Sequence, residues 1–306
     1  MGLTAPAAVA VAFALEAVLA EPPTRLHPVA WFGRAVAPFD REWRHPRAVG
    51  AGVALALPVV AAFAVGALVA LAGGADAWLA AVVAGVALFT ATSLRMLLGE
   101  ARALVAATER ADLDAARARL RSLAGRDPSD LSAGDLRSAA VESAAENLAD
   151  GLVAPLLAFA AGALVSLPVA AAAAAWVKGV NTLDSMLGYR SKPVGTASAR
   201  LDDAVMWLPA RLSAVLVAAA ALDPAALGRA RGHASRPPSP NSGWPMATLA
   251  AALGVRLEKP GAYALALGDG PPTVAESRRA ISVVGAAGVL AYALAGAAAA
   301  ARGVVA

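Results

Sequence analysis

Cysteine is absent from the 306 residues of this chain, and charged residues are scarce. Without cysteine there is no disulfide scaffold, no thiolate metal site and no cysteine nucleophile. Asp, Glu, Lys and Arg make up 16% of the residues, compared with about 25% in an ordinary soluble domain. Hydrophobic residues make up 59%, which excludes a globally disordered chain. The composition leaves a membrane protein or an unusually alanine-rich helical enzyme.

Lysine is rare as well. The chain has only Lys178, Lys192 and Lys259, so its formal net charge of +4 comes almost wholly from arginine. Basic residues beside apolar segments indicate how a membrane protein is oriented. We therefore interpret the basicity as a membrane signal and expect no nucleic-acid partner.

Four long segments contain no charged residue: 48–75, 77–94, 151–177 and 280–301. About 20 apolar residues in a helix cross the hydrocarbon core of a bilayer. Residues 1–20 are a weaker candidate, and because they lack a basic start we expect no cleaved signal peptide. No strand-like alternation persists along the chain. The sequence predicts an all-α, polytopic membrane protein with about four to five transmembrane helices. We expect the spans near residues 4–20, 49–72, 77–95 and 281–301.

The run 151–177 is interrupted by Pro168, which leaves two pieces that are each marginal as a span. A single crossing here would also place the polar segment 178–203 on the opposite side from 95–150, although both are rich in Asp, Asn and Arg. We therefore expect a buried or re-entrant hairpin at 151–177. We expect a similar hydrophobic helix at 204–222, which Arg211 interrupts.

Arginine gathers in 21–47 and 95–150, whereas the short connection 73–76 contains no basic residue. The positive-inside rule places arginine-rich segments in the cytoplasm. We therefore expect one multi-pass domain, 1–306, in the cytoplasmic membrane. Its catalytic segments would face the cytoplasm, and they are 21–47, 95–150, 178–203 and 223–280.

Glu142, Glu146 and Asp150 follow one another at steps of four residues, which an α-helix places on one face. Like charges at this spacing destabilise a helix unless a cation lies among them. Oxygen ligands of this kind suit Mg²⁺, usually together with substrate phosphates. The alternative is the solvated acidic face of an amphipathic helix.

The segment 178–203 combines acids, an amide, a phenol and arginines. They are Asn181, Asp184, Tyr189, Arg190, Arg200, Asp202 and Asp203. Charged side chains near a membrane are costly unless they are paired or functional. The set suits either a divalent cation or a salt-bridged structural corner, and together with the carboxylates of 142–150 it favours a phosphate-handling site.

The segment 233–244, HASRPPSPNSGW, combines a proline-fixed backbone with small polar residues. Amides and hydroxyls in such a loop can bind an anion. The candidate ligands here are Ser239, Asn241 and Gly243. His233 and, earlier in the chain, His27 are each either an acid–base group or a structural hydrogen-bonding residue. The chain has no GxxxxGK[ST], HExxH or GxSxG motif and no GxGxxG after a strand, so nucleotide chemistry would need another design.

Six segments, in order, resemble the adenosylcobinamide-phosphate synthase family of cobalamin biosynthesis, integral membrane proteins of the CobD/CbiB type. They are EPPTRLHPVAWFGR at 21–34, SLAGRDPSDL at 122–131, VESAAENLADGLVAPL at 141–156, NTLDSMLGYR at 181–190, GTASARLDDAVMWLPARL at 195–212 and HASRPPSPNSGWPMATLAAALGV at 233–255. They cover most of the chain outside the expected spans. One departure is Glu21-Pro22, where Asp-Pro is more usual, and the carboxylate is kept.

The resemblance implies a ligase that forms an amide bond. It joins adenosylcobyric acid to (R)-1-aminopropan-2-ol or its O-phosphate, consumes ATP, and gives adenosylcobinamide or its phosphate. A carboxylate is a poor acyl donor, so ATP would convert it to an acyl phosphate, with Mg²⁺ and arginine neutralising the phosphate charge. The implied cofactors are ATP and Mg²⁺. The implied partners are the corrinoid and amino-alcohol (phosphate) substrates and membrane lipid, with a homo-oligomer or association with other cobalamin-pathway enzymes left open.

With the resemblance, the candidate residues take hypothetical roles. Glu142, Glu146 and Asp150 would form one Mg²⁺–nucleotide site, and Asp184 with Asp202 or Asp203 a second. Phosphate would be held by Arg126, Arg190 and Arg200. The corrin side chain or the amino-alcohol would be positioned by Asn181, Tyr189 and the loop Ser239–Gly243, with His27 and His233 also counted as substrate-binding.

Two other classes of protein share some of these features. A small-molecule transporter would explain the spans and the charges at their edges, but no pair of broken helices recurs in two halves of the chain. A membrane phosphotransferase acting on a lipid would also use an Asp-rich Mg²⁺ site, but the sequence has no Asp-rich motif on each of two spans.

Overall fold

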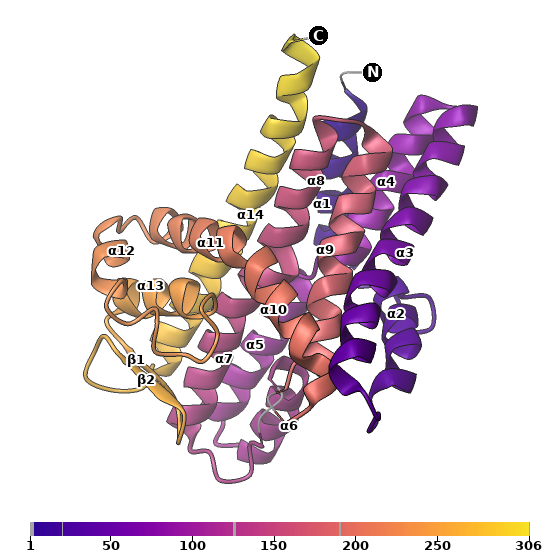
Figure 1. The fold of residues 1–306 in the computed structure, drawn as a ribbon. Helices are drawn as coiled ribbons and strands as arrows, with labels where there is room; N and C mark the ends of the chain where they lie inside the picture. The colour runs from indigo at the N-terminus through magenta and orange to yellow at the C-terminus, as the bar shows by residue number, and fades with distance from the viewer. Residues whose placement is uncertain (1–2, 20, 125–126, 190, 306) are drawn as a thin grey trace. The chain divides into compact units, whose positions relative to one another are not determined.

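The computed structural model of the chain describes residues 3–19, 21–124, 127–189 and 191–305 (Figure 1). Within these residues nearly everything is helical, and the strands form one short hairpin. The all-α fold class expected from the sequence is confirmed. Several helices are long and apolar enough to cross a membrane, which confirms the polytopic class as well.

Four stretches of helix have the length and composition of membrane spans. They are Pro46–Ala75 (α3), Ala77–Glu109 (α4, Ala77–Ala91, then α5, Arg95–Glu109), Ala133–Ala163 (α7, Ala133–Leu148, then the π-helical turn η2, Ala149–Val153, then α8, Ala154–Ala163) and Val274–Ala301 within α14 (Val274–Val305). Three of them contain the segments 49–72, 77–95 and 281–301. The segment 4–20 corresponds to α1 (Thr4–Leu19), whose 16 residues are fewer than the roughly 20 that a bilayer needs.

The stretch Ala133–Ala163 is not among the spans expected from the sequence. Its first half contains Glu142 and Glu146, which favour a segment in water. Glu142 is nevertheless buried inside the protein, with only 1% of its surface exposed. Burial by residues far away in the sequence is a tertiary property that hydropathy along the chain does not reveal.

The run 151–177 reverses direction near Pro168. Helix α8 ends at Ala163, and α9 (Leu167–Leu187) starts after Ser166, whose hydroxyl accepts a hydrogen bond from the Val169 amide at 3.3 Å. Pro168 lies in the first turn of α9, where its missing amide would have no helical partner in any case. Helices α8 and α9 then lie side by side (Figure 1).

The residues gather into two compact units, and the expectation of one multi-pass domain over 1–306 stays a prediction. Unit 1 comprises Met1–Ser93, Asp150–Met206 and Ala291–Ala306, and unit 2 comprises Leu94–Ala149 and Trp207–Leu290. Unit 1 also contains α2 (Pro28–Val36), η1 (Ala37–Phe39), η3 (Pro193–Gly195) and α10 (Thr196–Val205). Unit 2 also contains α6 (Leu113–Leu123), α11 (Trp207–Ala220), α12 (Ala225–Ala230), α13 (Gly243–Leu253), β1 (Arg256–Lys259) and β2 (Tyr263–Ala266).

Helix α9 is the central element of unit 1 and packs on α3, α4 and α8. Small residues allow a close approach between α3 and α9. A Cβ atom added to Gly66 of α3 would lie 3.2 Å from the Cβ of Ala172, and one added to Gly179 of α9 would lie 3.3 Å from Pro58. Small residues at such contacts are typical of helix pairs that associate in membranes.

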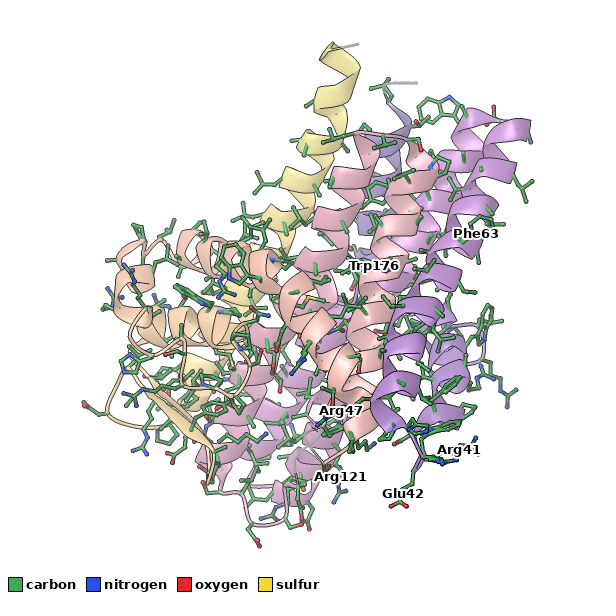
Figure 2. All side chains as sticks on the ribbon, in the orientation of Figure 1. Arg41, Glu42, Arg47, Phe63, Arg121 and Trp176 are labelled. Carbon is green, nitrogen blue, oxygen red and sulfur yellow. The ribbon has the colours of Figure 1, made fainter. Side chains whose placement is uncertain are left out.

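The surface of α3 differs along its length. Phe63, in the apolar middle of the helix, is 77% exposed. Figure 2 shows Arg41, Glu42 and Arg47 near the N-terminal end of the same helix. An apolar exposed length with charged residues at one end is the pattern of a helix that passes from water into lipid.

Unit 2 has a core of its own, formed by α5, α6 and α7. Leu104, Leu120 and Leu136, one from each helix, are fully buried there. The hairpin strands pair antiparallel, from Arg256 opposite Ala266 to Lys259 opposite Tyr263, and β1 packs on α7. These contacts fix the position of the residues that α7 presents to the hairpin.

Candidate functional site

Unit 1 contains an open pocket of about 360 Å³. Three elements and one irregular segment form it: α2, the end of α4, the second half of α9, and residues 21–27. Its lining is mostly polar side chains and small residues, namely Glu21, Pro22, Thr24, His27, Val29, Ala30, Gly33, Thr90, Thr92, Ser93, Lys178, Thr182 and Met186. The titratable side chains in that lining are Glu21, His27 and Lys178. We call this space the α9 pocket.

Lys178 brings the positive charge into the α9 pocket. It also lines a smaller, apolar cavity of about 70 Å³, beside Phe32, Ala61 and Ala175. Its aliphatic stem therefore lies among apolar residues, as is usual for lysine at a membrane protein's interior edge. The carboxylates of Glu21 and Asp150 are the charges that act on it most strongly. No hydrogen bond or ion pair joins its ammonium group to another residue in the part of the chain that the structure describes.

Glu21 and His27 face each other at the wall of the α9 pocket. The Nε2 atom of His27 lies 3.7 Å from Oε2 of Glu21, while Nδ1 of His27 accepts a hydrogen bond from the Val29 amide at 3.2 Å. Burial lowers the pKa of His27, and the positive charge of Lys178 lowers it further. Burial raises the pKa of Glu21, and Lys178 opposes that shift. His27 is therefore neutral at pH 7, with its proton on the nitrogen that faces Glu21.

Thr92 connects the α9 pocket to a buried polar group in the helices. Its hydroxyl lies 2.9 Å from the Tyr292 hydroxyl and 3.4 Å from Oε2 of Glu16. Glu16, in the short apolar helix α1, is 2% exposed. Buried polar groups in an apolar bundle cost free energy unless they are hydrogen-bonded, and this set provides those bonds across three helices.

A second polar group of unit 1 joins the end of α9 to α10. The side-chain amide of Asn181 lies 3.5 Å from Oδ1 of Asp202, which is 9% exposed. Asp184, in the last turns of α9 and outside the four candidate spans, is partly buried. Burial raises the pKa of Asp184, and the neighbouring carboxylate of Asp203 raises it further. The sequence predicted a cation site of Asp184 with Asp202 or Asp203 and a substrate-positioning role for Asn181. Unit 1 places Asn181 beside Asp202 and Asp184 near Asp203, and the roles of these residues stay predictions.

The donor chemistry of this second group fits Mg²⁺, since it consists of carboxylate and amide oxygens. Among the described residues no three His, Cys, Asp or Glu side chains are close enough to hold a metal ion by themselves. Mg²⁺ in nucleotide sites is usually held by one or two carboxylates together with phosphate oxygens and water. Asp184, Asp202 and Asp203 could supply a contribution of that size.

The first expected carboxylate set lies along one helical stretch, Ala133–Ala163. Glu142 and Glu146 belong to α7 in unit 2, whereas Asp150 belongs to unit 1 and to the π-helical turn η2. The regular α-helical spacing ends at Ala149, so Asp150 lies at the start of a π-helical turn rather than on a regular α-helix. The metal-binding role of these three carboxylates stays a prediction.

Glu142 is an acceptor within unit 2. Its Oε2 accepts a hydrogen bond from the Tyr263 hydroxyl at 3.1 Å, and its Oε1 accepts one from Ser138 at 3.2 Å. The Ser138 hydroxyl in turn accepts a hydrogen bond from the Glu258 amide of β1 at 2.8 Å. Glu142 thus fastens α7 to the hairpin.

The proline-rich loop of 233–244 is held by Arg211 of α11. One guanidinium nitrogen donates to Oδ1 of Asn241 at 2.5 Å and the other to the Pro240 carbonyl at 3.1 Å. The guanidinium also lies over the rings of Trp207 and Trp244, 4.8 and 5.3 Å from their centroids. Such stacking suits the flat, weakly hydrated guanidinium. Arg211, which interrupts an apolar helix in the sequence, therefore orders this loop.

The other residues expected to bind substrate in this loop are Ser239, Gly243 and His233, and the structure shows what surrounds each. The Ser239 hydroxyl accepts a hydrogen bond from the Asn241 amide at 3.2 Å. A Cβ atom at Gly243 would overlap the Ala234 carbonyl, which explains the glycine. His233 is partly buried, and its Nδ1 makes no hydrogen bond with the described residues.

Four remaining candidates carry phosphate or substrate roles in our prediction. Arg200 is exposed on α10. Tyr189 is 51% exposed, and Lys192 lies 5.1 Å from the centroid of its ring. Arg126 and Arg190 lie outside the described residues.

Glu21, Lys178 and Thr92 are absent from the residues predicted from the sequence. Glu21 is 157 positions away from Lys178, and nothing in the local sequence of either indicates that they line one pocket. A signal was nevertheless present for Lys178, since it is one of three lysines in the chain and ends an uncharged run of 27 residues, 151–177.

Comparisons with known proteins agree with one another. The family model described as CobD/Cbib protein matches residues 9–292. A probable cobalamin biosynthesis protein CobD of Methanothrix thermoacetophila is 36% identical over 92% of this chain and 92% of its own length. The cobalamin biosynthesis proteins CobD of Klebsiella pneumoniae and Mycobacterium tuberculosis are 38% and 42% identical, over 83% and 85% of this chain and 82% and 85% of their own lengths. No solved structure matches the chain.

Proposed function

The chain belongs to the CobD/Cbib family, an assignment that places it in cobalamin biosynthesis, and on that premise we propose that it is an ATP-dependent amide ligase. The acid substrate is adenosylcobyric acid. The amine substrate is (R)-1-aminopropan-2-ol or its O-phosphate, and the product is adenosylcobinamide or its phosphate.

The proposed reaction balances in two steps. A carboxylate oxygen of the corrinoid attacks the γ-phosphorus of ATP, which gives an acyl phosphate and ADP. The substrate ammonium group first loses a proton to a base, and the neutral amine then attacks the acyl carbon. Phosphate leaves, and the second proton lost from the attacking nitrogen passes to the departing phosphate. Each amide bond consumes one ATP, because a carboxylate is too poor an acyl donor to react with an amine directly.

One arrangement supports this chemistry best: two polar groups lie next to each other on α9. Lys178 and Thr182 line the α9 pocket, while Asn181 and Asp184 belong to the carboxylate group with Asp202 and Asp203. A ligase of this kind needs carboxylates that share a cation with phosphate, and a separate place for the amine.

Within this proposal Asp184, Asp202 and Asp203 are the residues that would hold Mg²⁺. When bound, the cation would neutralise phosphate oxygens of ATP. Asn181 keeps Asp202 oriented through its side-chain amide. Arg200, exposed on the same helix as Asp202, is placed to meet phosphate at that end of α9.

We also propose that the reaction takes place at the cytoplasmic face of the cytoplasmic membrane. ATP is available there, and the arginines of 21–47 follow the positive-inside rule. The names of the relatives refer to biosynthesis rather than to transport, so a transporter is not favoured.

The test is a reaction with purified components. Detergent-solubilised protein is mixed with adenosylcobyric acid, ATP, Mg²⁺ and either aminopropanol or aminopropanol phosphate, and the corrinoids are identified by mass spectrometry. We expect adenosylcobinamide or its phosphate to form only when ATP is present. A folded, monodisperse protein that forms neither product from either amine would overturn the proposal. Asp184→Asn is the matched variant, and the exposed, unrelated Asp114→Asn its control.

A further inference from the structure

We propose that the α9 pocket is the binding site of the amine substrate, with Lys178 holding an anionic group at one end of that small molecule and Glu21 holding its ammonium group at the other. The ligand class is an amino-alcohol phosphate. This inference rests on the proposed function, and it adds a prediction that the sequence did not make: Lys178 selects the phosphorylated amine over the free one.

The charges of the α9 pocket are complementary to such a molecule. No hydrogen bond or ion pair joins the ammonium group of Lys178 to the described residues, although the carboxylates of Glu21 and Asp150 act on it electrostatically. A buried ammonium group without a direct partner is costly. Glu21 acts on Lys178 electrostatically but lies beyond the 4.0 Å of an ion pair. The two charges therefore stand apart within one pocket, which leaves room for a ligand that carries the opposite charge at each end.

The size of the pocket suits a small substrate. A volume of about 360 Å³ lies at the small end of ligand pockets, which range from about 300 to 1,000 Å³. Such a space admits a molecule of the size of an amino-alcohol phosphate, whereas a corrinoid with its adenosyl group is too large to be enclosed in it.

Hydroxyl groups line the α9 pocket around the proposed ligand. Thr90, Thr92 and Thr182 donate to backbone carbonyls and keep lone pairs that can accept hydrogen bonds from the substrate ammonium group. Thr24 and Ser93 make no side-chain hydrogen bond with the described residues, so their hydroxyls can donate to phosphate oxygens. Short hydroxyl side chains that flank a lysine suit phosphate, because each adds one donor to the charge.

Glu21 and His27 form the proposed binding position for the ammonium group of the substrate. His27 Nδ1 is occupied by the Val29 amide, so its proton is on Nε2 and points toward Glu21. With His27 neutral, no cation among the described residues lies within ion-pair distance of Glu21. A substrate ammonium supplies that cation, and Glu21 thereby fixes which end of the molecule faces His27.

The experiment compares two amines on matched variants. The specificity constant is measured for aminopropanol phosphate and for aminopropanol, with wild-type protein, Lys178→Met and Glu21→Gln. Wild-type protein should prefer the phosphorylated amine. Lys178→Met should reduce the specificity constant for that amine by about 10- to 100-fold, the usual size of a charge-assisted contact, and should leave that for aminopropanol within about threefold. Glu21→Gln should reduce both, because both amines carry the ammonium group.

Two exposed residues provide the controls, Lys259→Met in β1 and Glu42→Gln before α3. Neither should change either specificity constant. Lys178→Arg should keep the preference for the phosphorylated amine, and the activity that Lys178→Met keeps with aminopropanol shows that this variant folds. Direct binding of aminopropanol phosphate, aminopropanol and inorganic phosphate to detergent-solubilised protein is measured by calorimetry without ATP.

The outcomes separate this inference from the proposed function. If wild-type protein forms cobinamide products but Lys178→Met keeps the wild-type preference between the two amines, the inference fails and the ligase proposal stands. If wild-type protein forms no product yet binds aminopropanol phosphate at a site that Lys178→Met abolishes, the binding site stands and the ligase proposal fails. Binding of inorganic phosphate as tightly as of aminopropanol phosphate contradicts the role of Glu21.

Discussion

His27 contacts Val29 and Glu21 through its two ring nitrogens. Its Nδ1 accepts a hydrogen bond from the Val29 amide at 3.2 Å, and its Nε2 lies 3.7 Å from Oε2 of Glu21. The first bond caps α2 and fixes the ring. The second directs the remaining ring proton to the wall of the α9 pocket. One side chain therefore couples the start of a helix to the charge arrangement of the pocket.

Substitutions at His27 should separate these two effects. His27→Asn can still cap α2 through its side-chain oxygen but cannot reach Glu21 with a ring nitrogen, so it should keep stability and lose activity. His27→Ala should lose the cap as well, at a cost of about 1 kcal/mol. Thermal unfolding in detergent and the ligase assay measure the two properties. Equal stability of the Asn and Ala variants would contradict the capping role.

The pKa of His27 predicts a pH dependence of stability. The unfolded side chain binds a proton near its ordinary pKa of 6.5, whereas the folded one, buried and beside Lys178, binds it only at lower pH. The unfolded state therefore binds more protons as the pH falls below about 6.5, and the free energy of unfolding decreases there. Glu21 shifts in the opposite sense, since its raised pKa favours the folded state at low pH.

Unfolding midpoints at pH 7.5 and 5.5 test the sign for His27. Glu21→Gln is compared with the double variant Glu21→Gln, His27→Gln, so that the titration of Glu21 does not contribute. The protein that retains His27 should lose more stability between the two pH values. A larger loss in the double variant would mean that the folded state favours protonated His27.

Gly188 is a steric requirement of the carboxylate group. A Cβ atom at this position would overlap Oδ1 and the carboxyl carbon of Asp184. Gly188→Ala should therefore displace the Asp184 carboxylate and reduce ligase activity at least tenfold, in the range that a misplaced catalytic group costs. Gly228→Ala in α12, where a methyl group meets no neighbouring atom, should leave activity unchanged. Full activity of Gly188→Ala would remove Asp184 from the site.

Substitutions of Asp184 and Glu142 should affect different properties of the protein. Asp184→Asn should raise the Mg²⁺ concentration needed for half-maximal activity, because a neutral amide is a weaker ligand than a carboxylate. Glu142→Gln should instead destabilise unit 2 by about 1–3 kcal/mol, since it disturbs a buried acceptor of two hydroxyl groups. Mg²⁺ titrations and unfolding curves of both variants distinguish a cation ligand from a structural acceptor. A normal Mg²⁺ requirement in Asp184→Asn, with a raised one in Glu142→Gln, would reverse our assignment.

The sequence predicted the helical membrane class because uncharged runs follow directly from composition. It also located the turn near Pro168, since proline has few positions available in a helix. The closeness of Asn181, Asp184 and the Asp202–Asp203 pair could also be predicted from the sequence. These residues lie within 23 positions of one another, 181–203, and the order of residues already keeps them close.

Features that depend on contacts between residues far apart in the sequence could not be predicted from local sequence patterns. A π-helical turn follows Leu148, and nothing in its sequence, ADGLV, indicates that the α-helix changes there. Glu142 is buried because Tyr263 reaches it from a hairpin 121 positions away. The α9 pocket joins Glu21 to Lys178 through packing between α2 and α9, and packing partners are not encoded in local sequence patterns.

The central claim is that ATP activates a corrinoid carboxylate for attack by an amine, and isotope transfer tests it most directly. Adenosylcobyric acid with ¹⁸O in the reacting carboxylate is incubated with the wild-type protein, aminopropanol phosphate, ATP and Mg²⁺, and the inorganic phosphate is examined by mass spectrometry. An acyl phosphate intermediate predicts that one ¹⁸O atom moves into phosphate for each amide formed, with ADP as the nucleotide product. Amide formation with no ¹⁸O in phosphate, or without any ATP, would contradict the account.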